Sequence, residues 1–234
     1  MERAGVVVEH DEALLRLTIV GNHYRRFNDK ISSDYTSASY FLASAALSRG
    51  TTILTNMRSE SLQGERAIVD MLCEMGIHCH FDPVAETLTV ENRRESFSGE
   101  YEFDVSDCPN IVPTLAALGS FVESRFRVIG ASITRFYKSQ RVDAIVTQLR
   151  KMEVDINPVM KGSVVDGFEI HGRHTYEGWK MLSSWFDHRV FMSLVITSLH
   201  TQQGNAVEGL QGVDEYSPGI LSQFSHNGAD LESI

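Results

Sequence analysis

Two spacings of apolar residues follow one another along the chain and predict its elements. Within residues 65–75 and 141–152 apolar side chains recur every three or four positions, which is the spacing of an amphipathic helix. Residues 40–47 and 191–199 are apolar on nearly every side, so we expect the helices there to be surrounded by protein. Short apolar stretches bounded by turn residues predict strands between these helices.

The same succession of elements occurs three times. Each time a polar or proline-containing turn opens an apolar helix that a strand follows, and these helices begin near residues 37, 109 and 187. In the first two copies a second helix and a hairpin come next, with the hairpins over residues 77–90 and 154–170. The predicted repeat is therefore β-α-β-α-β-β.

The third copy ends after a weak second helix at residues 219–224 and has no hairpin of its own. The chain instead begins with a hairpin, whose strands cover residues 5–9 and 15–20. An unpaired sheet edge favours aggregation, so we expect this opening hairpin to complete the third copy. Three units would then surround a pseudo-threefold axis, with their helices inside.

These patterns predict one α/β (α+β) domain over residues 1–224, followed by a flexible polar tail. Its parts are the hairpin, unit one, unit two, unit three and the tail, at residues 1–22, 33–92, 101–172, 183–224 and 225–234.

Composition narrows the class of protein. The chain has 234 residues, 42% of them hydrophobic, and can bury a large core. Its net charge of −10 disfavours a nucleic-acid partner, and no apolar stretch is long enough to span a membrane. The start is not a signal peptide, and three cysteines without a CxxC pair argue against a disulfide framework. We therefore expect a cytoplasmic protein.

Five segments, in chain order, carry motifs that occur together in one enzyme family. Residues 33–47 resemble the family's GDxSSASYFLAAAA segment, 61–65 its S-x-Q-G-D and 107–114 its P-D-x-x-x-T turn. Residues 135–151 resemble R-x-K-E-[ST]-[DE]-R … T-E-L-R-K, and 187–192 resemble D-H-R-M-A-M, the most specific of the five. Together these segments resemble the 5-enolpyruvylshikimate-3-phosphate synthases over about residues 1–224, and this resemblance implies a fold of three β-α-β-α-β-β units per domain. It also implies transfer of a carboxyvinyl group from phosphoenolpyruvate to shikimate 3-phosphate, a shikimate-pathway step, without a cofactor.

The chain carries only half of the architecture that the resemblance implies. Family members have two such domains and bind both substrates between them. This chain resembles the carboxy-terminal half, and residues 1–21 resemble only the last hairpin of the other domain. We therefore expect the isolated chain not to turn over substrate, and a complementary polypeptide or a homodimer to cover its exposed face.

The resemblance also implies site residues. Arg141 and Arg189 match arginines that clamp phosphoenolpyruvate, a role that suits the bidentate guanidinium group, and Arg135 belongs to the same motif as Arg141. The alternative is that both are solvated surface arginines. His188 matches a site histidine; the alternative, which is compatible with that role, is a structural cap of the helix that starts near Asp187, with Asp187 as the N-cap.

Four positions depart from the family pattern. Asn110 stands where an aspartate binds the substrate hydroxyls, and an amide cannot accept their proton. Tyr137 replaces a substrate-binding lysine, Lys138 replaces the catalytic glutamate, and Glu215 stands at the place of a catalytic lysine. Lys138 and Glu215 could be an exchanged acid–base pair, but we favour drift after loss of catalysis. The alternatives to a synthase half are a non-catalytic protein that keeps an anion pocket and a decaying synthase.

No metal site is expected. His78 and His80 share one strand face, but no third ligand is evident and Cys79 points to the opposite face. We expect Trp179 and Trp185 to pack rather than to bind a cofactor.

Overall fold

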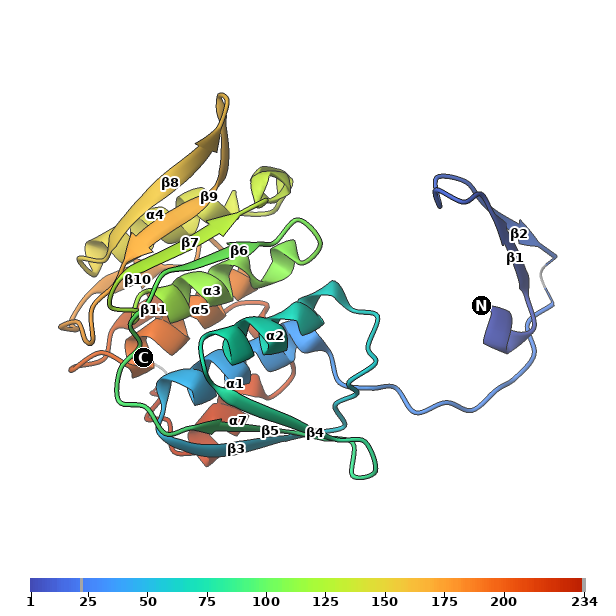
Figure 1. Cartoon of the computed structure of the whole chain (residues 1–234), viewed down its shortest axis with the longest axis horizontal. Coiled ribbons are helices and arrows are strands. Elements are labelled where there is room, and N and C mark those ends of the chain that lie inside the picture. Colours follow the sequence, from blue (N-terminus) through green and yellow to red (C-terminus); the bar gives the residue numbers. More distant parts are fainter. Residues whose placement is uncertain (22, 233–234) are drawn as a thin grey trace. The chain divides into compact units, whose positions relative to one another are not determined.

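The chain divides into two compact units. The structure is a computed structural model that describes residues 1–21 and 23–232. Its units are Met1–Ser32 and Ser33–Ile234, and each is described by itself (Figure 1).

The first unit is a hairpin with a short helical turn, η1 (Glu2–Ala4), before it. Strands β1 (Val7–His10) and β2 (Leu17–Val20) are antiparallel, with Val7 opposite Val20. Asp11 holds the turn, because its carboxylate accepts a hydrogen bond of 2.8 Å from the backbone nitrogen of Leu15. Among the described residues these strands pair only with each other. The hairpin is as predicted, and its role in completing the third copy of the repeat stays a prediction.

The second unit contains three sheets, one for each predicted copy. The first is antiparallel and has the order β3-β5-β4; the second has the order β6-β7-β9-β8; the third is the parallel pair β10-β11. The strands are β3 (Gly50–Thr55), β4 (His78–Asp82), β5 (Thr87–Asn92), β6 (Tyr101–Asp104), β7 (Arg125–Ile129), β8 (Asp155–Lys161), β9 (Val164–His171), β10 (Met181–Ser183) and β11 (Ala206–Glu208).

The three sheets are versions of one pattern. In the four-stranded sheet β6 runs parallel to β7, and the hairpin β8-β9 adds to the other edge of β7. The first sheet has the equivalents of β7, β8 and β9, and the third has the equivalents of β6 and β7. Both hairpins predicted in these copies, 77–90 and 154–170, are confirmed.

One backbone hydrogen bond recurs in all three copies. In each copy, a backbone nitrogen that precedes the first helix donates to a backbone oxygen at the end of the strand that follows this helix. The pairs are Ser33 to Asn56 at 3.0 Å, Val105 to Ile129 at 2.9 Å, and Ser184 to Glu208 at 3.1 Å. This bond sets the same register in each copy, and it supports the pseudo-threefold arrangement.

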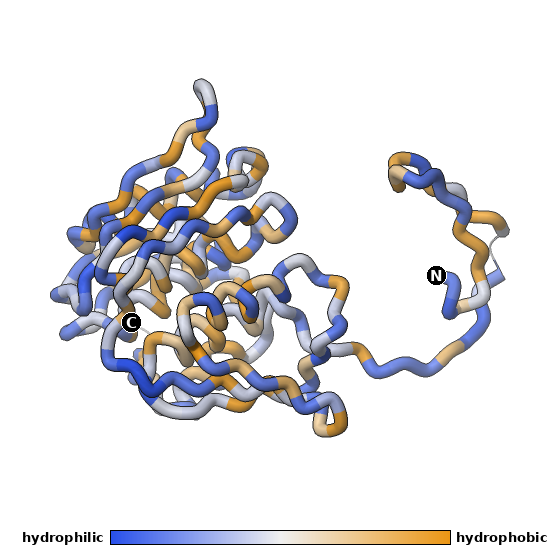
Figure 2. Tube along the Cα trace, in the orientation of Figure 1, coloured by the Kyte–Doolittle hydropathy of each residue, from blue (hydrophilic) through white to orange (hydrophobic). Residues whose placement is uncertain are grey.

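The first helices of the three copies lie inside the fold, as predicted (Figure 1). Helix α1 (Tyr35–Leu47) packs against α3 (Val112–Gly119) and α5 (His188–Leu199), and α3 packs against α5. Every residue of α3 and nine of α1 are buried, because these helices face one another rather than water. Apolar and polar residues alternate along the strands, which have one covered face (Figure 2).

Besides the three inner helices, the second unit has further helices, several of them short. They are η2 (Gly64–Arg66) with α2 (Ala67–Glu74), η3 (Pro109–Ile111) before α3, η4 (Ser132–Phe136) before α4 (Arg141–Lys151), α6 (Val213–Tyr216) and α7 (Ile220–His226).

The carboxy-terminal helix reaches further than predicted. Helix α7 continues two residues past the predicted end at Phe224, whose ring stacks on that of Phe41 with centroids 4.4 Å apart. Ala229 and Leu231 also pack against this part of the core. Residues 233–234 of the predicted tail lie outside the described residues, and the flexibility of the tail stays a prediction.

Candidate functional site

Motif residues from all three copies meet at the amino-terminal ends of the helices. Asp187 caps α5: its carboxylate accepts a hydrogen bond of 2.9 Å from the backbone nitrogen of Arg189. Aspartate at this position satisfies a backbone donor that the helix leaves without a partner. The predicted capping role of Asp187 is therefore confirmed.

Arg141, the first residue of α4, is buried against Asp187. Its side chain is 6% exposed and that of Asp187 is 1% exposed, so the alternative of a solvated surface arginine is wrong for Arg141. The Nε of Arg141 donates to Asp187 Oδ2 at 2.9 Å, and the Ser139 hydroxyl donates to the same oxygen at 2.9 Å. The guanidinium carbon also lies 4.4 Å from the ring centroid of Tyr137.

This ion pair governs the protonation of Asp187. Burial alone would raise the pKa of the carboxyl, but the charge and hydrogen bond of Arg141, with the donors at Arg189 and Ser139, outweigh it and lower the pKa below its usual value. Asp187 is therefore charged at neutral pH, and the pair resembles the buried ion pairs whose separation is strongly destabilising.

Asn110 joins Arg141 to a carboxylate that the sequence did not single out. Arg141 Nη1 donates to Asn110 Oδ1 at 3.1 Å, and Asn110 Nδ2 donates to Glu65 Oε1 at 2.8 Å. Gly64 makes this approach possible, because a Cβ atom there would overlap the backbone oxygen of Asp107. Glu65 and Asn110 both lie in matched motifs, so the S-x-Q-G-D resemblance was the signal that could have found Glu65.

His188 and Arg189 form the second part of the cluster. Arg189 Nη1 lies 2.9 Å from His188 Nε2, and since guanidinium only donates, Nε2 accepts and the ring proton is on Nδ1. The His188 ring stacks on Tyr216 with centroids 3.8 Å apart and planes 5° from parallel. Burial, and then the charge of Arg189, lower the pKa of His188 to about 4, so its ring is neutral at pH 7.

Two donors in this cluster have no acceptor among the described residues. Both His188 Nδ1 and Arg189 Nε are buried and without a hydrogen-bond partner there. Buried donors are nearly always paired in proteins, so these two atoms are candidates for an acceptor that the described residues do not supply. Tyr216, which orients His188 by stacking, carried no signal in the sequence.

The other predicted residues are exposed around the cluster. The guanidinium carbon of Arg135 lies 4.5 Å from the ring centroid of Phe136, and Lys138 is close enough to help lower the pKa of His188. Glu215 is exposed on α6. In the described part of the chain Lys138 and Glu215 form no ion pair or hydrogen bond, so they are not brought together as a pair.

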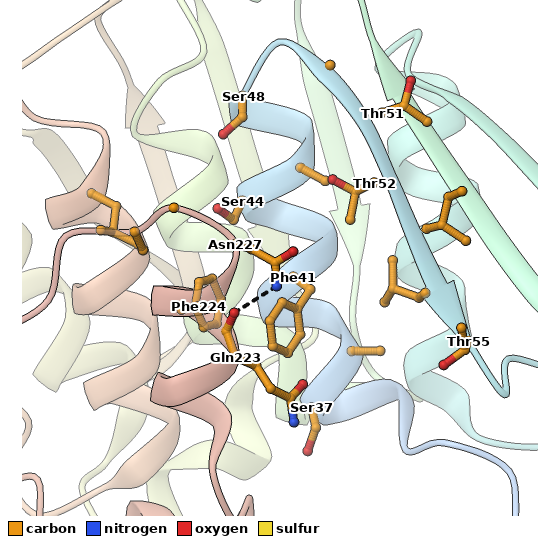
Figure 3. Close-up of a pocket in the computed structure, with 18 of the residues that line it drawn as sticks. Ser37, Phe41, Ser44, Ser48, Thr51, Thr52, Thr55, Gln223, Phe224 and Asn227 are labelled. Carbon is orange, nitrogen blue, oxygen red and sulfur yellow. Dashed lines mark hydrogen bonds between the residues drawn. The ribbon is translucent and has the colours of Figure 1, made fainter.

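A separate hollow of about 780 Å³ lies beside β3, between α1 and α7 (Figure 3). One face of α1 contributes Ser37, Phe41 and Ser44, Ser48 follows the end of this helix, and β3 contributes all of its residues. The predicted site residues do not line this hollow, so its size does not identify it as the site.

The remaining expectations concern metals, tryptophans and membranes. Among residues 1–21 and 23–232, no group of three or more His, Cys, Asp or Glu side chains is placed to hold a metal ion. Trp179 is 83% exposed, so the prediction that it packs is wrong, and Trp185 is 40% exposed. No helix in the described part of the chain is both long and apolar enough to cross a membrane.

The fold and the cluster define a domain of the enolpyruvyl-transferase type. Two solved structures support this class: EPSP synthase from Acinetobacter baumannii superposes with a TM-score of 0.79 at 20% identity, over 100% of this chain and 54% of that one. The enolpyruvyl transferase NikO from Streptomyces tendae gives 0.70 at 16% identity, over 98% of this chain and 51% of that one.

The chain belongs to the EPSP synthase (3-phosphoshikimate 1-carboxyvinyltransferase) family, whose family model matches residues 1–221. A 3-phosphoshikimate 1-carboxyvinyltransferase from Ruminiclostridium cellulolyticum is 25% identical over 234 residues, 100% of this chain and 53% of the relative. That from Methanosarcina mazei is 31% identical over 210 residues, 87% of this chain and 45% of the relative. The chain thus spans about half the length of these relatives.

Proposed function

We propose that this chain is one half of a 3-phosphoshikimate 1-carboxyvinyltransferase, which binds the anionic groups of phosphoenolpyruvate and shikimate 3-phosphate and needs a complementary polypeptide for turnover. The observation that carries the proposal is the pair of buried donors, His188 Nδ1 and Arg189 Nε, that have no acceptor among the described residues. A phosphate or carboxylate oxygen supplies what they need.

The surroundings favour an anion at this place. Arg141 and Asp187 neutralise each other, so the charge of Arg189 is left over for a ligand. The amino-terminal ends of α4 and α5 add the positive ends of two helix dipoles. A cytoplasmic location, expected from the sequence, stays a prediction.

Calorimetric titration with phosphoenolpyruvate tests the binding part of the proposal. We expect saturable binding by the whole chain and a loss of at least about tenfold in affinity for Arg189→Gln, because a charged hydrogen bond contributes about 1.5–3 kcal/mol. Arg93→Gln is the matched control, since Arg93 is 82% exposed. Equal binding by the two variants, or no binding by the wild type, contradicts the proposal.

A non-catalytic protein that keeps the anion pocket is the second candidate. It is favoured by Lys138 and Glu215, which stand at catalytic positions of the family with opposite charge and do not contact each other in the described part of the chain. A turnover assay with both substrates, alone and with cell extract added, distinguishes the two candidates. Turnover only with extract supports the synthase half, and turnover in neither case favours the non-catalytic protein.

Exchange of the two charged residues addresses the acid–base alternative. If Lys138 and Glu215 exchanged roles, the double variant Lys138→Glu, Glu215→Lys gains no activity over the wild type. A gain in that variant shows that the family arrangement is the competent one and that the present pair results from drift.

A further inference from the structure

The carboxylate of Glu65 lies next to the one position of the site that has lost its carboxylate. Asn110 stands where the resemblance places a hydroxyl-binding aspartate, and its Nδ2 is 2.8 Å from Glu65 Oε1. The two turns that carry these residues are held together by the close approach of Gly64 to the backbone of Asp107. The packing of these two backbone turns therefore keeps Glu65 beside Asn110.

The chemistry of the partners fixes the orientation of the Asn110 amide. Its Oδ1 must face Arg141, because a guanidinium group only donates, and its nitrogen must face Glu65, because a carboxylate only accepts. Asn110 thus has one polar atom on each neighbour. An aspartate in the same place would set two carboxylates side by side, and one of them would have to bind a proton.

The amide also separates Glu65 from the cation. Within the described residues Glu65 forms no ion pair, and its second oxygen, Oε2, accepts no hydrogen bond. The side chain is half-buried, so Oε2 is not fully enclosed by the core, and it accepts no hydrogen bond from Arg141. A carboxylate oxygen in this state is a strong acceptor for a hydroxyl donor.

We propose that Glu65 is a specificity-determining residue of this site, which accepts a hydrogen bond from a hydroxyl group of the ligand in place of residue 110. The inference rests on the proposed function, because Arg189 and His188 must hold the anionic group of the same ligand. The site then selects a phosphorylated polyol or hydroxy acid over an anion without hydroxyl groups.

Calorimetry with two probes tests this role. Shikimate 3-phosphate carries hydroxyl groups and phosphoenolpyruvate carries none. For Glu65→Gln we expect about a tenfold loss of affinity for shikimate 3-phosphate and less than a twofold change for phosphoenolpyruvate. The glutamine oxygen can still accept from Asn110, so the turn keeps its hydrogen bond. Glu74→Gln, exposed at the end of the same helical segment, is the control and should change neither affinity.

The outcomes separate this inference from the proposed function. Equal losses for both ligands in Glu65→Gln indicate a purely structural role and overturn the inference, and so does unchanged binding of both. A wild-type chain that binds phosphoenolpyruvate but not shikimate 3-phosphate overturns the inference alone. A wild-type chain that binds neither ligand overturns the proposed function and this inference with it.

Discussion

At the scale of single residues, the contact between Arg141 and Asp187 is the one on which the cluster depends. The two residues are 46 positions apart and join α4 to the start of α5. Because both side chains are almost completely buried, neither charge has water to replace a lost partner.

Removal of the cation should therefore be costly. For Arg141→Met we expect a loss of about 3–5 kcal/mol in the free energy of unfolding, because Asp187 is left as an unpaired buried charge. Arg49→Met is a matched control, since the pair of Arg49 with Glu95 is exposed and should contribute less than about 1 kcal/mol. Urea unfolding measures both, and equal losses would contradict the role of the buried pair.

Two histidines should make the fold sensitive to weak acid. Burial lowers the pKa of His200 to about 4, and burial with Arg189 does the same for His188. Between pH 4 and 6.5 the unfolded chain binds more protons at these residues than the folded chain does. The free energy of unfolding therefore falls as the pH is lowered through this window.

The size of the effect can be measured residue by residue. At pH 5 each of the two histidines should take up nearly one proton on unfolding. His200→Gln should remove about one of these protons, and His188→Gln the other. An unchanged slope of unfolding free energy against pH in either variant would refute the assignment for that histidine.

At the scale of elements, Gly64 decides how closely the turn before α2 approaches the turn before α3. Gly64→Ala should cost about 1–3 kcal/mol of unfolding free energy, because its methyl group overlaps the backbone oxygen of Asp107. Gly204→Ala is the control, since nothing lies within 4 Å of a Cβ there and its φ is not positive. It should stay within about 0.5 kcal/mol. Similar thermal melts for the two variants would contradict the close approach.

The predictability of the elements followed their length and periodicity. The inner helices and the two hairpins β4-β5 and β8-β9 follow from local spacing of apolar residues, which is visible in the sequence alone. Strands β10 and β11 have three residues each and depend on each other across the chain, so no local pattern defines their bounds. The end of α7 was underestimated because its last residues are polar, and the exposure of Trp179 has no local signal at all.

The same limit applies to the site. Motif resemblance placed Arg141, Asn110 and His188 in it, and the structure brings these residues into one cluster. It could not give the burial of Arg141 or the contact of Glu65 with Asn110, because both arise from contacts between residues 45 or more positions apart.

At the scale of the whole molecule, nearly all of the buried core lies in residues 33–234. Among the described residues of the opening unit, only Ala4 and Val6 are buried apolar residues, and a lone two-stranded hairpin is at best marginally stable. Six large apolar side chains of that hairpin are also 48–88% exposed: Val7, Leu14, Leu15, Leu17, Ile19 and Val20. Such a surface favours association with another protein surface.

Deletion of residues 1–32 tests what the hairpin contributes. If the hairpin completes the third copy, as the sequence predicts, its deletion should lower the Tm by about 10 °C, well beyond the 2–4 °C that about 1 kcal/mol causes in a protein of this size. A shortened chain that melts within about 3 °C of the full chain would contradict the hairpin as the missing piece of the third copy. Calorimetric scans of both chains give the answer.

The cluster draws on all three copies of the repeat: Glu65 comes from the first, Asn110 and Arg141 from the second, and Asp187 with Arg189 from the third. No single copy contains a complete anion site, so the site is a property of their junction. Ligand affinity therefore depends on the folding stability of residues 33–234, and a bound anion should raise the melting temperature of this unit. A screen of variants for loss of ligand binding would therefore detect substitutions that disturb folding far from the arginines as readily as substitutions beside them.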